Sequence, residues 1–315
     1  MHRKVGTLRR RRTLFKGASV TAIVLALAMT APAAIATFPG KNGDIAFGRF
    51  TKGQVDIWAF NAKSGDKRRL TDTPRRNEGM PDWNADGTKL AFSRCGLNQF
   101  SNCDIWVMDA DGGNETRITT TDIAQETWPT WSPDDTQIAY TSNEADAFQD
   151  IWVVNADGTE PTLLTPGVEV FDAFPEWSPD GTRIAFTSTR EDYDDIWVMS
   201  ADGSDPVRLT TGGKKIDERP DWSPDGTRIT FSRNGNIWIM DADGENETKL
   251  TSNKRHEFNP TFSPNGKLIA YNREGKDGRF GVWTLRIGGS AVKKRTFGLF
   301  DFFPDWQSAP VGGLR

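Results

Sequence analysis

Six carboxylates recur at one position of a repeated phrase, and they are the side chains of this sequence best placed to bind a ligand. The phrase reads acid-x-x-Pro-x-aromatic, with the acid five positions before a Trp or Phe. Carboxylates gathered around one axis could hold a hard cation such as calcium, or attract a cationic peptide. The six acids are Glu78, Glu126, Asp172, Asp217, Glu257 and Asp301.

A structural role for the same acids is the competing interpretation. In four copies an Arg stands two residues after the aromatic of the next apolar run, and antiparallel pairing would bring it to the acid. The predicted ion pairs are Glu78–Arg94, Asp217–Arg233, Glu257–Arg273 and Asp301–Arg49. The other two copies carry Ser142 and Ser188 there, so Glu126 and Asp172 are the best candidates for a free acidic site.

The repeat that positions these acids contains four strand-like pieces. In the central copy, Phe174–Ser178 is followed by the Pro-Asp-Gly turn at 179–181 and by the alternating run Arg183–Ser188. Asp195–Ser200 and Val207–Thr210 come next, joined by an Ala-Asp-Gly turn. We call the four strands a to d in this order, with a innermost.

The spacing of the repeats predicts a propeller. Successive strand-a aromatics at 83, 131, 177, 222, 262 and 306 are 48, 46, 45, 40 and 44 residues apart, the period of a four-stranded blade. Three N-terminal strands (Asp44–Arg49, Asp56–Phe60 and Lys67–Leu70) follow a degenerate turn over Phe38–Gly43 and lack a strand a. Asp301–Gln307 is a strand a with nothing after it. We therefore predict an all-β, six-bladed propeller whose last strand joins the first three.

Eleven of the twelve Trp residues repeat on strands a and c, which indicates packing between blades. Trp128 alone falls outside the pattern, in what we expect to be a loop before a strand. It is therefore a candidate contact for a partner or a sugar. Cys95 and Cys103 flank a short loop between strands b and c, and an exported protein would join them in a disulfide. Two free thiols are the alternative.

The first 36 residues have the composition of an export signal. Arg9–Arg12 and Lys16 are basic, Ala18–Met29 is apolar but short for a membrane span, and Ala34-Ile35-Ala36 suits cleavage. The string RRTLFK matches a twin-arginine signal, with the general export route and an uncleaved anchor as alternatives. We predict a periplasmic or extracellular protein with a leader at 1–36, a propeller at 37–310 and a tail at 311–315.

The charge of the remaining chain excludes one class of partner. The leader holds seven of the 39 basic residues and no acid, so the rest carries 32 basic against 43 acidic residues, a net charge of −11. Nucleic acid binding is not expected from such a surface. We expect no membrane span after signal removal.

The phrases PEWSPDGTRIAF (Pro175–Phe186), DIWVMDADGGNETRIT (Asp104–Thr119) and PDWSPDGTRITF (Pro220–Phe231) resemble the WD40-like propeller repeats of the TolB family. The resemblance covers roughly residues 38–307. It implies a partner segment of a cell-envelope protein docked at the channel mouth. Strands are predicted from Asp44 onward, so we do not expect the separate N-terminal α/β domain of TolB itself, nor a Tol–Pal-type complex.

Catalysis finds little support in the sequence. His256 is the one His after the leader, and no Gly-x-Ser-x-Gly elbow occurs. We therefore expect a monomeric, non-catalytic propeller without a cofactor that binds a protein or peptide at the channel mouth, through the six acids, Trp128 and His256. A carbohydrate- or metal-binding propeller is the alternative, with calcium as the candidate ion. A metal-dependent hydrolase of the lactonase or phytase type ranks below both, and it would need the six acids unpaired.

Overall fold

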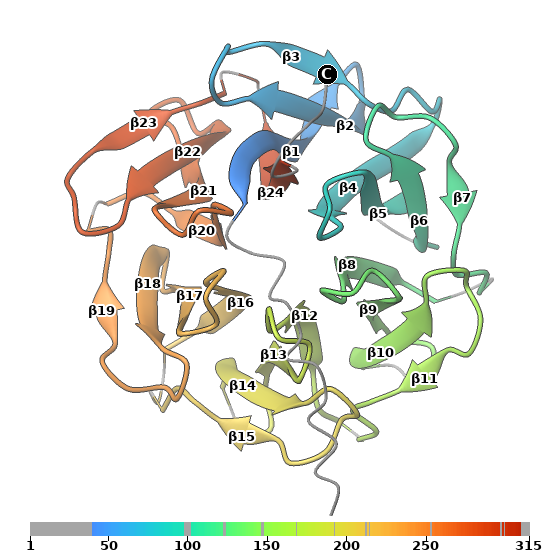
Figure 1. Ribbon diagram of the computed structural model, residues 1–315, viewed down its shortest axis with the longest axis vertical. Helices are drawn as coiled ribbons and strands as arrows, with labels where there is room; N and C mark the ends of the chain where they lie inside the picture. The colour runs from blue at the N-terminus through green and yellow to red at the C-terminus, as the bar shows by residue number, and fades with distance from the viewer. Residues whose placement is uncertain are drawn as a thin grey trace, which may run out of the picture. The chain divides into compact units, whose positions relative to one another are not determined.

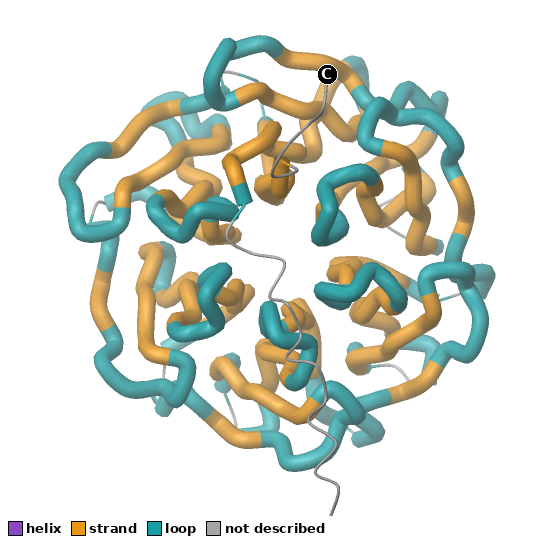
Figure 2. Tube along the Cα trace, viewed as in Figure 1, coloured by secondary structure: helices purple, strands orange, loops and turns teal. Residues whose placement is uncertain are grey.

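The computed structural model describes residues 40–97, 102–121, 124–145, 148–167, 169–191, 193–211, 213, 215–252, 254–296, 298 and 300–309. Six four-stranded antiparallel sheets form a ring of blades in this part of the chain (Figure 1), as predicted. Figure 2 shows that the described residues form strands and loops without a helix. Within them, no helix is long and apolar enough to cross a membrane. The predicted leader at 1–36 and tail at 311–315 lie outside the described residues.

The blades are numbered in chain order, and their strands are given from the innermost outward. Blade 1 comprises β24 (Asp301–Ala309), β1 (Lys41–Thr51), β2 (Gln54–Asn61) and β3 (Lys67–Arg69). Blade 2 comprises β4 (Arg76–Trp83), β5 (Lys89–Gly96), β6 (Asp104–Asp109) and β7 (Thr116–Arg117). Blade 3 comprises β8 (Glu126–Trp131), β9 (Gln137–Ser142), β10 (Asp150–Asn155) and β11 (Thr162–Leu163).

The second half of the ring repeats this plan. Blade 4 comprises β12 (Asp172–Trp177), β13 (Arg183–Ser188), β14 (Asp195–Ser200) and β15 (Val207–Arg208). Blade 5 comprises β16 (Asp217–Trp222), β17 (Arg228–Arg233), β18 (Asn236–Asp241) and β19 (Thr248–Lys249). Blade 6 comprises β20 (Glu257–Phe262), β21 (Leu268–Glu274), β22 (Phe280–Arg286) and β23 (Val292–Lys294).

The hydrophobic core lies between blades and not within them. Strand β13 is buried on both faces from Ile184 to Ser188, because one blade packs against each side of it. One core cluster joins Ala139 and Ile151 of blade 3 to Trp177 and Phe186 of blade 4. A single blade would leave such surfaces in water, so the blades stabilise one another as repeats do.

The ring closes where β24 pairs with β1. Ile45 lies opposite Trp306 and Arg49 opposite Asp301, as the complementary ends of the sequence predicted. The prediction of a turn over Phe38–Gly43 is wrong for its last three residues. Strand β1 already begins at Lys41, which pairs with Ala309. Gly43 permits this approach, since a Cβ there would lie 2.8 Å from the backbone oxygen of Gln307.

A repeated Thr fastens each short outer strand to strand c. The Thr hydroxyl oxygen accepts the N–H of the strand-c residue 14 positions earlier, at 2.8–3.0 Å in every blade. These residues are Thr71, Thr119, Thr165, Thr210, Thr251 and Thr296. The bond lies just beyond strands of only two or three residues, so it extends their pairing.

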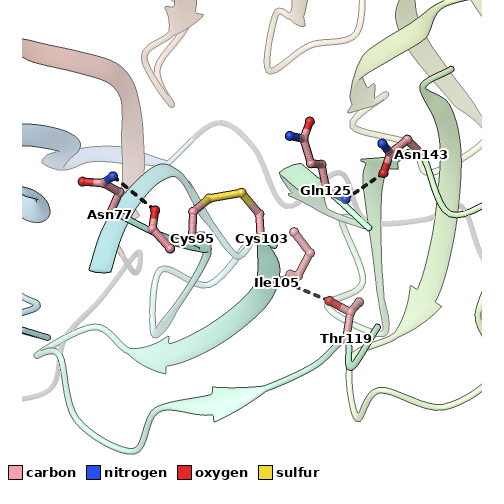
Figure 3. Close-up of a disulfide and its surroundings, with 8 residues drawn as sticks. Asn77, Cys95, Cys103, Ile105, Thr119, Gln125 and Asn143 are labelled. Atoms are coloured by element: carbon pink, nitrogen blue, oxygen red, sulfur yellow. Dashed lines mark hydrogen bonds between the residues drawn. A yellow bond between two sulfur atoms is a disulfide. The ribbon is translucent and has the colours of Figure 1, made fainter. Parts of the chain in front are cut away.

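The predicted disulfide joins Cys95 to Cys103, with both side chains buried (Figure 3). It closes a loop with a sequence separation of 8, which corresponds to a stabilisation of about 2–3 kcal/mol. The carbonyl of Cys103 accepts the N–H of Glu126 at 3.0 Å, and Gln125 beside it donates its N–H to Asn143 at 2.7 Å. The disulfide therefore holds the b–c loop of blade 2 where blade 3 begins.

Candidate binding site in the central channel

The six predicted acids lie in the interior and not on an open ring at the channel mouth. Five of them begin their innermost strand as expected and Glu78 is the third residue of β4, but each is at most 1% exposed. All four predicted ion pairs are present, with N–O distances of 2.5 Å for Arg94–Glu78, 2.6 Å for Arg233–Asp217, 2.7 Å for Arg49–Asp301 and 3.5 Å for Arg273–Glu257. In each pair the guanidinium carbon also lies 4.3–5.1 Å from the ring of the strand-c Trp.

Asp172 is also paired, contrary to the sequence-based expectation. Arg190, two residues beyond the position of the other arginines, reaches its carboxylate at 2.6 Å. The hydroxyl oxygen of Ser188 accepts the N–H of Arg190 at 3.2 Å. Asp172 is therefore not a free acidic site.

Glu126 is the one of the six acids for which no basic partner occurs among the described residues. Thr121 donates to Oε1 at 3.0 Å, while Oε2 is buried and has no hydrogen-bond partner in the described part of the chain. Burial raises the pKa of Glu126 to about 7, against hydrogen bonds from Thr119 and Thr121. Its side chain does not reach solvent, so Glu126 is an interior carboxyl and not an open binding site.

The residue that precedes Pro in the repeated phrase lines the channel instead. All six such residues have a left-handed backbone, with φ between 53° and 60°, where the pairing of strands a and b is interrupted by a bulge. A positive φ is rare for bulky side chains. Its recurrence at the same position of all six blades indicates that this backbone conformation has a structural or functional role. We call this set the plug: Met80, Trp128, Phe174, Arg219, Asn259 and Phe303.

The prediction that Trp128 lies in a loop is wrong. Trp128 lies within β8 and is a member of the plug. It packs edge-on against Phe174 and Phe303, with ring centroids 4.8 and 4.7 Å away. The guanidinium carbon of Arg219 lies 4.7 Å from the rings of both Trp128 and Phe174. Burial lowers the pKa of Arg219 to about 10, against the opposing charge of Glu218. The plug is therefore an aromatic cage around one guanidinium.

A second ring of acids lies one layer deeper, and the sequence analysis missed it. The residue immediately before the strand-a aromatic is acidic in four blades and Thr in two, Thr130 and Thr261. Two cavities of about 90 Å³ meet at this layer, and residues of all six blades line them. We call these four residues the acid ring: Asp82, Glu176, Asp221 and Asp305.

The acid ring binds backbone groups of the neighbouring blades. Trp83 donates its N–H to Asp305 at 2.8 Å, Trp131 to Asp82 at 2.8 Å, and Phe262 to Asp221 at 2.7 Å. Burial, and then repulsion between the carboxylates, raises the pKa of Glu176; burial raises that of Asp305 to about 6. Among the described residues, no three His, Cys, Asp or Glu side chains form a group that could hold a metal ion.

Replacing Glu176 by glutamine is expected to stabilise the protein above neutral pH. A carboxyl whose pKa is raised on folding binds more protons in the folded state, so its contribution to stability falls as pH rises from about 4 through its folded pKa. The neutral amide would remove this loss, for a gain of about 1–2 kcal/mol or about 2–8 °C in Tm at pH 8 and little change at pH 4. Melting curves at both pH values test this, with Glu245→Gln at the surface as the control. A lower Tm at pH 8 would contradict it.

The mouth above the plug is aromatic. A cavity of about 640 Å³ is lined by Glu218, Arg219, His256, Phe258, Phe302 and Phe303 among others, which places His256 at the mouth as predicted. From there a series of rings with centroids 5.7–6.4 Å apart runs through Phe302 and Phe300 to Phe50. Exposed apolar side chains surround this face, and we call them the rim: Phe50, Leu97, Phe148, Tyr193 and Ile216.

Fold and channel together define a six-bladed propeller with an apolar rim, an aromatic mouth and a central channel lined by the plug. The chain belongs to the TolB β-propeller domain family, whose sequence model matches residues 25–166 and 144–306. A comparison with curated proteins finds no match.

Solved structures agree with this fold. TolB from Acinetobacter baumannii is similar with a TM-score of 0.72 and 20% identity, over 84% of this chain and 66% of that one. A putative TolB from Agrobacterium tumefaciens gives a TM-score of 0.66 and 24% identity, over 85% of this chain and 92% of that one. This chain therefore spans about two thirds of the Acinetobacter protein, and the likeness concerns the fold alone.

Proposed function

We propose that this protein is an exported, non-catalytic propeller that binds a protein or peptide of the cell envelope at the mouth of its central channel. The observation that carries the proposal is the concentration of exposed apolar side chains on one face. Side chains of the rim are 37–49% exposed. Phe50 lies at the end of strand b in blade 1, Leu97, Phe148 and Tyr193 stand in b–c connections, and Ile216 stands just before strand a of blade 5. These connections meet at the same face of a propeller, and exposed apolar side chains gathered on one face favour an interaction site.

The aromatic residues beneath the rim support a protein partner. Tyr, Trp and Phe are enriched at the centres of protein interfaces, where they supply large contact areas with few side-chain torsions. The mouth offers six such rings in continuous contact, from Phe50 through Phe300, Phe302 and Phe303 to Trp128 and Phe174. Membership of the TolB propeller family and the composition of the leader favour a partner in the envelope.

A capture experiment with matched variants tests the proposal. Tagged protein comprising residues 37–315 would be incubated with envelope extract, alongside Tyr193→Ser/Ile216→Ser at the rim and Val207→Ser/Val292→Ser on the outer strands. Both pairs of residues are exposed and apolar, but the second pair lies at the perimeter. We expect the rim variant to capture a partner about tenfold less well and the outer variant to match the wild type, since a loss of about 1.4 kcal/mol, summed over two truncated contact residues, is a tenfold loss of affinity.

Melting curves would show that both variants remain folded. Equal capture by the rim variant and the wild type would place the binding surface elsewhere on the propeller. Loss of capture by the outer variant alone would also contradict the proposal.

A further inference from the structure

Arg219 differs from the arginines that neutralise the predicted acids, because it has no carboxylate partner among the described residues. The arginines beside five of the six acids reach a carboxylate at 2.5–3.5 Å, whereas no ion pair of Arg219 occurs in the part of the chain that the structure describes. Its Nη1 donates to the side-chain oxygen of Asn259, and no described residue accepts a hydrogen bond from its buried Nε. A half-buried charge with unmatched donors is costly, so a ligand that supplies acceptors would be favoured.

The position of Arg219 makes this charge available at the mouth. Its side chain lines both the cavity of about 640 Å³ at the mouth and the cavity of about 90 Å³ that contains the acid ring. The rings of Trp128 and Phe174 lie 4.7 Å from its guanidinium carbon and occupy positions over the guanidinium group. A ligand would therefore bind to the N–H groups at the edge of the guanidinium. A planar carboxylate matches that edge in shape and charge.

The walls of the mouth cavity specify the rest of the ligand. Phe258, Phe302 and Phe303 line it on one side, and the guanidinium carbon lies 5.9 Å from the rings of Phe258 and Phe303. An apolar side chain therefore fits beside the carboxylate. Glu218 lines the same cavity and opposes a second negative charge.

We propose that Arg219 binds a carboxylate of the docked partner segment, with a neighbouring apolar side chain of that segment against Phe258, Phe302 and Phe303. The inference rests on the proposed function for the identity of the ligand as a protein segment. It adds the chemistry that the segment must present: an acidic group, from an Asp or Glu side chain or a C-terminus, next to an apolar residue.

A pair of small probes that differ only in the carboxylate tests this directly. N-acetylphenylalanine and N-acetylphenylalanine amide would be titrated by calorimetry into the protein comprising residues 37–315. We expect the acid to bind at least about tenfold more tightly than the amide, because only the acid forms a charge-assisted bond with Arg219. Arg219→Met should abolish this preference, and Arg219→Lys should retain part of it.

Two further variants control for charge in general. Glu218→Gln should tighten binding of the acid by removing the repulsion, while Lys254→Gln, an exposed cation just before β20, should leave the preference unchanged. Equal binding of acid and amide to the wild type, no binding of the acid, or a preserved preference in Arg219→Met would each overturn the proposal and leave Arg219 a structural plug. Capture of the partner that depends on the rim but not on Arg219 would overturn it while the proposed function stands.

Discussion

Replacing Arg233 by methionine is expected to lower the free energy of unfolding by about 3–5 kcal/mol, because it leaves a buried carboxylate without its counter-charge. Arg233 is 2% exposed and donates to both oxygens of Asp217 at 2.6 Å. It also donates to Glu247 at 2.9 Å and lies 4.8 Å from the ring of Trp238. Burial disfavours the charged form of Arg233, but the hydrogen bonds and negative charges of Asp217 and Glu247 have the larger effect. The pKa of Arg233 is therefore raised.

Urea denaturation of three variants separates the charge effect from the loss of packing. Arg233→Met should be the least stable, and adding Asp217→Asn should recover much of the loss, since the buried carboxylate is then removed and Glu247, whose side chain is 29% exposed, can be solvated. Arg190→Met should cost less, because the Arg190 side chain is 28% exposed and water can partly solvate Asp172 after the change. A loss below about 1 kcal/mol for Arg233→Met would mean that the pair behaves like a surface salt bridge.

The architecture could be predicted from the sequence because it follows from a repeat. The period of the phrase around Trp177 fixes the length of a blade, and the missing strands at the two ends fix how the ring closes. The ion pairs could also be predicted from the repeat, since the antiparallel register of strands a and b places Arg233 opposite Asp217. Arg190 was missed because a long side chain two residues past the expected position can still reach the acid at 2.6 Å.

The lining of the channel could not be predicted in the same way. Strand alternation assigns a side chain to one face or the other, but a left-handed residue before Pro breaks the alternation in each innermost strand. Trp128 therefore appeared to lie outside the pattern, although Phe174 and Arg219 occupy the same place in other copies. The sequence does mark the plug residues, because each of them is the third residue of an acid-x-x-Pro phrase. The meaning of this position depends on the backbone conformation, which residue types alone do not specify.

The acid ring was missed for a related reason. Asp221 and Glu176 stand between the Pro and the Trp of the repeated phrase, where a surface acid on an innermost strand would be unremarkable in sequence. Only the convergence of several blades on one axis makes neighbours of residues some 45 positions apart, as in the bond from Trp131 N–H to Asp82 at a separation of 49. Long-range geometry, and not local pattern, creates this part of the site.

Replacing Trp306 by alanine is expected to lower the free energy of unfolding by about 3–5 kcal/mol and to open the ring where it closes. Trp306 is 5% exposed and packs in a cluster with Ile45, Phe47 and Val282, which joins blade 1 to blade 6. Its strand β24 pairs with β1 across a long sequence separation and without a connecting hairpin. The other five innermost strands continue directly into strand b of their own blade.

Hydrogen exchange distinguishes this local opening from a general loss of stability. Trp177→Ala is the matched control, because Trp177 is 6% exposed at the equivalent position of blade 4. Both variants should lose similar free energy of unfolding, but only Trp306→Ala should selectively accelerate exchange of amides in β1 and β24. The reason is that separation of these strands relieves the cavity without breaking any other blade, whereas β12 is held to β13 by its turn. The same exchange pattern in β1 and β24 for both variants would show that the closing blade is no weaker than the others.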